Sequence, residues 1–175
     1  RQRQRVAVGR CACAEARRVA RAATRAKAAE VEGRVLAIDG LNVITTIEVA
    51  LARGVLLLGR DQCMRDMASF HGSYRLVHET EPALAILVDL VRALRPTHTV
   101  VYIDRPVSNS GRLAEALRET ARARGVGLEA ETADDVDGML KRSEGVVASA
   151  DSAILDVCGA WLPLARLAVE RHRDA

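Results

Sequence analysis

The sequence predicts an α/β fold in which a doubly wound, mostly parallel sheet is covered by helices on both faces. Short runs of β-branched and aliphatic residues alternate with amphipathic segments, hydrophobic residues make up 49% of the chain, and only four residues are Phe, Trp or Tyr. A core of Ala, Val, Leu and Ile suits parallel strands that are buried on both faces. The length of 175 residues accommodates one such domain and leaves no room for a second.

Residues 1–30 are predicted to form a basic, Ala- and Arg-rich helical extension ahead of the α/β domain at residues 31–175. The extension holds nine Lys or Arg and two Glu, whereas the rest of the chain has more Asp and Glu than Lys and Arg. A basic arm beside an acidic body can attract a polyanion, and a solvated helix with no such role is the alternative. The arginines concerned are Arg5, Arg10, Arg17, Arg18, Arg21 and Arg25.

The first half of the domain is predicted to begin with a buried strand at residues 34–38, because the run Arg-Val-Leu-Ala-Ile is short and apolar. It ends at Asp39, and a helix over residues 42–52 follows. The stretch 55–74 mixes apolar and polar residues without a clear period, so no element is assigned to it. His71 and Tyr74 lie there and are expected to have packing or surface roles.

Two further strand–helix units are predicted after residue 74. A helix from Thr80 to the residue before Pro96 precedes a buried strand at residues 99–103, which again ends at an aspartate, Asp104. A helix from about residue 111 to 125 leads to an edge strand at residues 127–131.

The last part of the chain is predicted to contain a third strand that ends in an aspartate. An acidic loop, which includes Asp137, leads to the buried run 146–148, and Asp151 follows it. Short and longer helices at residues 154–157 and 163–172 complete the chain.

The three aspartates at the ends of separate strands are the strongest functional signal. Ligands of open parallel sheets bind beyond the carboxyl ends of the strands, where strand order reverses, so Asp39, Asp104 and Asp151 are expected to meet in one crevice. Converging carboxylates repel one another unless a cation neutralises them, and oxygen ligands favour Mg²⁺ or Mn²⁺. The alternative for each aspartate alone is a turn or helix cap.

These segments resemble a known superfamily. Residues 38–42 (Ile-Asp-Gly-Leu-Asn) are similar to the first motif of PIN-like and NYN-like metal-dependent ribonucleases, and residues 146–152 to their late strand-plus-Asp motif. Over most of its length the chain further resembles an uncharacterised branch, DUF434-type, known only as a domain of unknown function. The resemblance implies a PIN-like, Rossmannoid fold and metal-dependent cleavage of RNA, with the three aspartates at the acidic positions.

The superfamily usually has a further acid on a middle helix, for which Glu48 is the first candidate. It shares a helix face with apolar residues, so an ionised Glu48 needs either a function or a buried Arg partner. Asp66 competes with it, unless it is only a charge on a helix surface. Asp156 is a weaker candidate because it lies about 140° round a helix from Asp151.

Several polar residues are candidates for substrate binding. Ser108, Asn109 and Ser110 precede the helix near residue 111, whose positive end can hold a phosphate, and Arg112 can add a bidentate contact. Capping of the helix by Ser110 is the alternative. Asn42 and Ser152 complete the predicted set, with Asn42 either orienting a ligand or capping its own helix.

The leading functional hypothesis is therefore a hydrolase that uses Mg²⁺ or Mn²⁺ to cut RNA. A non-catalytic RNA- or nucleotide-binding module and a small phosphate-ester hydrolase are the alternatives. The four cysteines form no CxxC pair, so zinc is not expected, and no apolar run is long enough to span a membrane. Scattered thiols favour a reducing, cytoplasmic setting, and a homodimer is compatible with the sequence.

Overall fold

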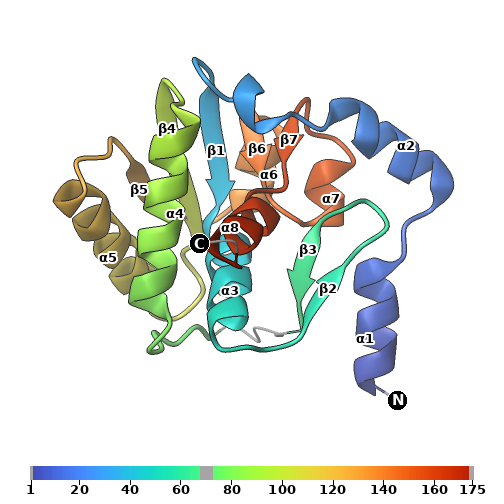
Figure 1. Cartoon of the computed structure of the whole chain (residues 1–175), viewed down its shortest axis with the longest axis horizontal. Coiled ribbons are helices and arrows are strands. Elements are labelled where there is room, and N and C mark those ends of the chain that lie inside the picture. Colours follow the sequence, from blue (N-terminus) through green and yellow to red (C-terminus); the bar gives the residue numbers. More distant parts are fainter. Residues whose placement is uncertain (1, 68–72, 174–175) are drawn as a thin grey trace.

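The centre of the fold is a five-stranded sheet with the order β5-β4-β1-β6-β7, in which all neighbouring strands are parallel. A computed structural model describes residues 2–67 and 73–173 of the chain. Figure 1 shows the sheet with helices on both sides. The strands are β1 (Val35–Asp39), β4 (His98–Asp104), β5 (Glu129–Ala133), β6 (Val146–Ala148) and β7 (Trp161–Leu162).

Alternate residues of each strand face two separate hydrophobic clusters. Leu36 and Ile38 of β1 pack into the larger cluster, whereas Ala37 between them packs into the smaller one on the opposite face. The larger cluster lies under α3 (Gly40–Leu51), α4 (Thr80–Leu94), α5 (Ser110–Ala123) and α8 (Leu164–Arg173); the smaller lies under α6 (Val136–Lys141) and α7 (Ser152–Leu155). The predicted doubly wound α/β class is confirmed.

The order of the strands places a switch point between β1 and β6. From β1 the chain adds β4 and then β5 on one side, and afterwards returns to add β6 and β7 on the other. In such sheets the crevice at the switch point, beyond the carboxyl ends of the strands, is the usual place for a ligand. The ends of β1, β4 and β6, where the three predicted aspartates lie, border this crevice.

Gly40 allows the close approach that begins α3. A Cβ atom at this position would lie 2.8 Å from the carbonyl oxygen of Tyr102 in β4, closer than real Cβ contacts come. Only glycine therefore fits between β1 and α3 without moving β4.

The N-terminal segment forms two helices, as predicted, but it is not detached from the domain. The elements are α1 (Gln2–Cys11), α2 (Glu15–Thr24) and a 3₁₀ turn (Ala28–Glu30). The indole Nε1 of Trp161 donates a hydrogen bond of 2.8 Å to the carbonyl oxygen of Arg21, whose side chain is only 4% exposed. Residue 25 also bridges to β7 in parallel orientation. The second helix is thus anchored on the body.

Three features escaped the sequence analysis because they are short. Residues 55–74 contain an antiparallel hairpin of β2 (Leu56–Leu58) and β3 (Met64–Asp66), the acidic loop contains α6, and β7 has two residues. Such elements are too brief to show a period. His71 lies outside the described residues. In the described ranges, no helix combines the length and the apolar character needed to cross a membrane.

Candidate functional site

A cavity of about 480 Å³ lies at the carboxyl edge of the sheet and is lined by five aspartates. The three predicted from the sequence, at the ends of β1, β4 and β6, all line it; their functional roles stay predictions. One further aspartate comes from the end of β3 and another from α6. The five residues are Asp39, Asp66, Asp104, Asp137 and Asp151.

Asp39 is the most buried of the three predicted aspartates, with 7% of its surface exposed. Its Oδ1 accepts a hydrogen bond from the backbone N–H of Asn42 (3.3 Å) and its Oδ2 accepts one from Ser149 Oγ (2.7 Å). Burial raises the pKa of Asp39 to about 7; the two hydrogen bonds oppose this shift, and the charges of Asp104 and Asp151 add to it. A carboxylate in this position calls for a nearby cation.

Ser149 connects Asp39 to the loop that carries Asp151. Its hydroxyl donates to Asp39 and accepts from the backbone N–H of Asp151 at 3.0 Å. Asn42 of α3 makes a second link to this loop, because its Oδ1 accepts from the backbone N–H of Ala150 at 2.9 Å. Asn42 lines the cavity, and its side-chain oxygen holds the loop instead of capping its own helix. Ser149 was not predicted as a site residue, although it directly follows the apolar run 146–148.

Asp104 and Asp137 both line the cavity and lie near enough for their charges to interact. Burial raises the pKa of Asp104 above its ordinary value, and the negative charge of Asp137 raises it further. Asp137 lies in the first turn of α6, and its side chain is 56% exposed. Its contribution was not predicted because the acidic loop was not assigned to any element.

Asp66 lies at the edge of the cavity, where α1 of the N-terminal segment contacts it through Arg10. It is buried on β3 rather than on a helix surface, which corrects the alternative considered for it. Thr46 Oγ1 donates to its Oδ2 at 3.1 Å, and the guanidinium of Arg10 donates both to its Oδ1 at 3.2 Å and to its carbonyl oxygen. Arg10 thus brings a positive charge to the edge of an acidic cavity.

Whether this cavity can bind a divalent cation depends on the side-chain atoms that line it. Within residues 2–67 and 73–173, no three His, Cys, Asp or Glu side chains lie close enough together to form a metal-binding group. The five carboxylates thus share a cavity without forming one coordination sphere. Mg²⁺ usually keeps several waters and uses one or two protein carboxylates, so a cavity with five aspartates suits a hydrated Mg²⁺ or Mn²⁺, although Arg10 and Arg65 also line it.

Glu48, the first choice for the fourth acid, does not line the cavity. Its Oε1 accepts hydrogen bonds from Tyr74 Oη (2.5 Å) and Thr80 Oγ1 (2.6 Å). Burial raises the pKa of Glu48, and the two hydroxyl groups partly offset this effect. The expectation that a buried Glu48 needs a partner was sound, but the partners are hydroxyls that link α3 to α4. Asp66 and Asp137 are the acids that lie beside the three predicted aspartates.

The predicted phosphate cradle before α5 is also corrected. Ser110 is buried, and its hydroxyl donates to the carbonyl oxygen of Arg105 at 3.2 Å. The side-chain amide of Asn109 donates to the carbonyl oxygen of Tyr74 at 2.7 Å, and Ser108 forms a backbone bridge with residue 73. These residues hold the chain after β4. Like the exposed Arg112, none of them lines the cavity.

Asp156 is turned away from the cavity. Its carboxylate forms ion pairs with Arg17 and with Arg21 (2.7 Å), so it is not an additional ligand. Ser152 does line the cavity, and its Oγ accepts from Arg21 Nη1 at 3.3 Å.

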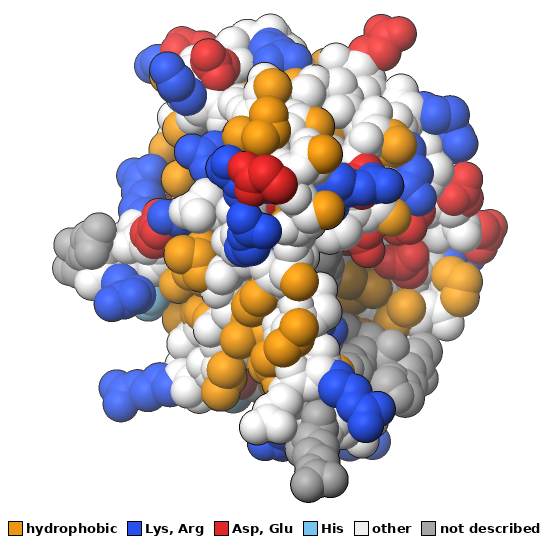
Figure 2. Space-filling model, turned by 90° about the vertical axis from the view of Figure 1, so that its right-hand side faces the viewer, with side chains coloured by type: hydrophobic (Ala, Val, Ile, Leu, Met, Phe, Trp, Pro, Cys, Tyr) orange, Lys and Arg blue, Asp and Glu red, His pale blue; other side chains and the backbone are white. Residues whose placement is uncertain are grey.

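Four of the six arginines named as a basic handle in the arm are paired, and the attraction of a polyanion stays a prediction. Arg10, Arg17, Arg18 and Arg21 pair with carboxylates of the protein itself. Figure 2 shows the side on which α1 and α2 lie, where Lys and Arg side chains are spread among Asp and Glu rather than gathered in one patch. Arg5 and Arg25 are exposed.

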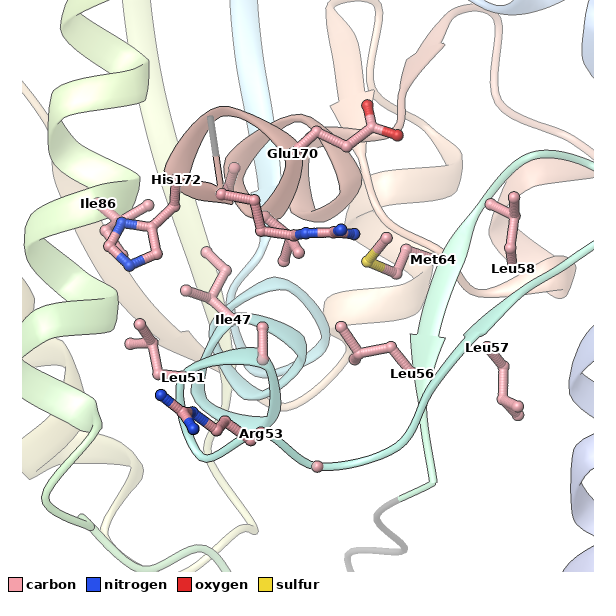
Figure 3. A pocket seen from close by; sticks show the side chains of 15 residues that line it. Ile47, Leu51, Arg53, Leu56, Leu57, Leu58, Met64, Ile86, Glu170 and His172 are labelled. Carbon is pink, nitrogen blue, oxygen red and sulfur yellow. The ribbon is translucent and has the colours of Figure 1, made fainter. Parts of the chain in front are cut away.

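A larger cavity of about 640 Å³ lies elsewhere, between α3, α8 and the β2–β3 hairpin (Figure 3). Its labelled side chains are mainly aliphatic, among them Ile47, Leu51, Leu56 and Met64. Glu170 is the only acid among its lining residues in the described part of the chain. It therefore lacks the converging carboxylates of the strand-end cavity.

Comparison with known proteins gives a family without an assigned activity. Residues 28–167 match the family described as Domain of unknown function (DUF5616), a span that includes all five cavity aspartates. The chain belongs to this family. The uncharacterized protein MJ0935 of Methanocaldococcus jannaschii is 30% identical over 129 residues, covering 74% of this chain. This chain spans 61% of the length of that relative. No solved structure matches this chain.

Proposed function

We propose that this protein is a metal-dependent nuclease that hydrolyses RNA phosphodiester bonds at the strand-end cavity, with Asp39, Asp104 and Asp151 as the acidic site. The observation that carries the proposal is the cavity itself, where a buried aspartate, Asp39, shares the lining with four further aspartates. Asp39 accepts a capping hydrogen bond at the start of α3, as a structural aspartate does, but it is also buried where the charges of Asp104 and Asp151 raise its pKa, and a cap alone does not require neighbouring acids. The resemblance to PIN-like ribonucleases supports the same reading.

The residues that line the cavity would have distinct roles in the reaction. One or two of Asp39, Asp104 and Asp151 would bind the cation directly, and the remaining aspartates of the cavity would bind its waters. When bound, Mg²⁺ or Mn²⁺ lowers the pKa of water and neutralises charge on phosphate oxygens. Arg10 at the rim would contact a phosphate and so offset the repulsion between the acids and the RNA backbone.

The test combines metal binding with cleavage. Mn²⁺ is expected to raise the melting temperature of the protein, and a fluorescent single-stranded RNA is expected to be cut with Mn²⁺ and not with EDTA. Asp104→Asn should abolish both effects. Asp134→Asn is the matched control, because Asp134 is a nearby aspartate that is 69% exposed, pairs with Arg105 and does not line the cavity.

Each outcome of this test discriminates between functions. Intact Mn²⁺-dependent cleavage in Asp104→Asn would show that the acidic site is wrongly assigned. Salt-sensitive RNA binding that EDTA does not affect, with no product on long incubation, would favour a non-catalytic binding module. Turnover of a chromogenic phosphate ester with the RNA left uncut would favour a small phosphate-ester hydrolase.

A further inference from the structure

Two arginines hold the loop of the proposed site on either side of Asp151. Arg65 Nε donates to the carbonyl oxygen of Ala150 at 2.8 Å. Arg21 Nη2 donates to the carbonyl oxygen of Ser152 at 3.3 Å, and its Nη1 reaches the hydroxyl of the same residue. The backbone is therefore fixed at the residue before and at the residue after Asp151.

Both guanidinium groups are fixed in turn by one carboxylate, that of Asp61. Its Oδ2 lies 2.6 Å from Arg21 Nη1 and 2.6 Å from Arg65 Nη2, and its Oδ1 accepts from Arg65 Nη1 at 2.9 Å. The Asp61 side chain is 1% exposed. Burial alone would raise the pKa of Asp61, but the hydrogen bonds and charge of Arg65, assisted by Arg21, lower it. Buried, charge-assisted hydrogen bonds of this kind define position well.

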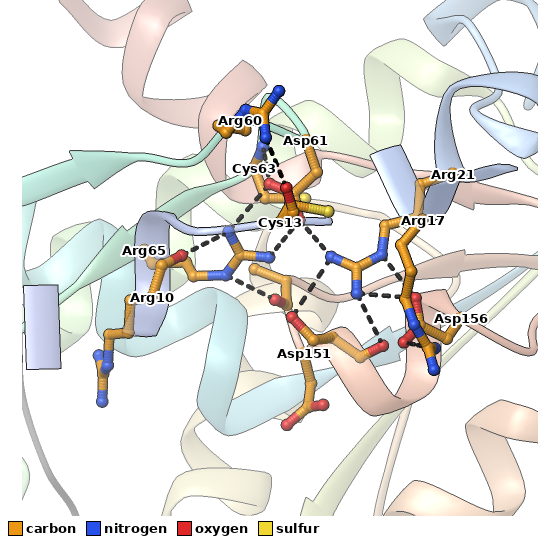
Figure 4. A network of polar contacts seen from close by, with 12 residues as sticks. Arg10, Cys13, Arg17, Arg21, Arg60, Asp61, Cys63, Arg65, Asp151 and Asp156 are labelled. Atoms are coloured by element: carbon orange, nitrogen blue, oxygen red, sulfur yellow. Dashed lines mark hydrogen bonds and ion pairs between the residues drawn. The ribbon is translucent and has the colours of Figure 1, made fainter. Parts of the chain in front are cut away.

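We propose that Asp61, Arg21 and Arg65 are positioning residues that hold the Asp151 loop so that its carboxylate faces the cavity. In Figure 4 the Asp151 carboxylate extends away from the arginine network, which contacts the loop through its backbone. Arg21 does not line the cavity, so it acts on the site only through the loop. The importance of this role for catalysis rests on the proposed function; the role in holding the loop does not.

Asp61, Arg21 and Arg65 together are called the clamp below. This clamp also gives the N-terminal segment a function other than attraction of RNA. Arg21 belongs to α2, and the two carboxylates that it meets are the buried Asp61 of the hairpin loop and the partly exposed Asp156 at the end of α7. Arg65 adds a link to α1, because its Nη1 donates to the carbonyl oxygen of Arg10 at 3.0 Å. The segment therefore completes the support of the site loop from outside the sheet.

Arg21→Lys in the full chain is the most direct test. Lysine keeps the positive charge beside Asp61, but a single ammonium group cannot reach Asp61 and Ser152 in the fixed geometry of a guanidinium. Arg118→Lys is the matched control: Arg118 also joins a carboxylate, Glu115, to a backbone carbonyl, but on α5 and β5, outside the cavity. Arg65→Lys is a second test variant, should Arg21→Lys fail to fold; because Arg65 lines the cavity, this variant is judged by hydrogen exchange and not by Mn²⁺ affinity.

Two measurements are made on each variant. Amide hydrogen exchange is followed by NMR at Ala150, Asp151 and Ala153, whose N–H groups donate to the side chains of Asn42, Ser149 and Asp151 respectively. In Arg21→Lys their exchange should accelerate about tenfold relative to the control, while the amides of β1 and β4 stay protected. The dissociation constant of Mn²⁺ should rise by about the same factor.

The results separate this inference from the proposed function. Unchanged exchange at the three loop amides would show that the arginine does not hold the loop and would overturn the proposal. An equal loss of protection throughout the chain would also overturn it, because the arginine would then support only global stability. If the wild-type protein does not bind Mn²⁺, the proposed metal site fails, and the exchange rates still decide whether the clamp exists.

Discussion

Replacing Asp39 by Asn tests the electrostatic basis of the site without any assumption about substrate. Burial raises the pKa of Asp39 to about 7 in the folded protein, against an ordinary value of 3.8 for an aspartate. The folded state therefore binds this proton more tightly than the unfolded state, so the contribution of Asp39 to stability falls as pH rises from about 4 to about 7. The full difference corresponds to about 4 kcal/mol, at about 1.4 kcal/mol for each pH unit.

Asn has nearly the same shape and carries no charge. In EDTA at pH 8 the variant should gain most of this free energy, less about 1 kcal/mol because the hydrogen bond with Ser149 is disturbed. A net gain of about 3 kcal/mol corresponds to a melting temperature roughly 6–12 °C higher for a chain of this size. At pH 4 the two proteins should be equally stable, or the variant slightly less so.

The assay is thermal unfolding of both proteins in EDTA between pH 4 and pH 8.5, followed by titration with Mn²⁺. The cation should stabilise the wild-type protein and leave the variant unchanged, because the charge that attracts it is gone. A stability difference that does not vary with pH, or a variant that is less stable at pH 8, would refute the reasoning that Asp39 is a buried carboxylate in need of a cation.

Three other substitutions test separate parts of the structure. Glu48→Ala should lower the free energy of unfolding by about 2 kcal/mol in chemical denaturation, since two buried hydroxyls lose their partner, and should leave Mn²⁺ binding intact. Gly40→Ala should cost about 1–3 kcal/mol in the same assay and weaken Mn²⁺ binding in a calorimetric titration, because its Cβ meets the Tyr102 carbonyl; an unchanged protein would contradict this close contact. Thr99→Val should melt at the same temperature or slightly higher, because Thr99 Oγ1 is buried without a hydrogen-bond partner; a clear loss of stability would reveal a partner.

The sheet and the three strand-end aspartates were predictable because they depend on local pattern. The strands that end at Asp39 and Asp104 and the strand before Asp151 are short apolar runs, and the direction of parallel strands brings their carboxyl ends to one edge. No knowledge of side-chain contacts was needed for this step. The same reasoning named Asp66 only as a competitor of Glu48 and could not place it, because it lies on a hairpin of three-residue strands. It did not name Asp137 as a site residue, because this aspartate lies in a six-residue helix.

The partners of buried charges were not predictable, because they come from distant parts of the chain. Helical periodicity correctly placed Glu48 on a buried face, but its partner Tyr74 lies 26 residues away in a stretch without a period. The number of charged residues in the N-terminal segment likewise did not predict which carboxylates its arginines bind. Arg21 binds carboxylates 40 and 135 residues further along the chain, so a segment that looks solvated in sequence is fastened to the body.

The long reach of Arg21 has a consequence for biosynthesis. Asp156, which fixes one end of the guanidinium, is made 135 residues after the arginine. Contacts between such distant residues form late, since the intervening chain must be ordered first. A nascent chain can thus build the β1–α3 region while the segment around Asp151 has yet to be made, and the site is complete only after residue 156 has been synthesised.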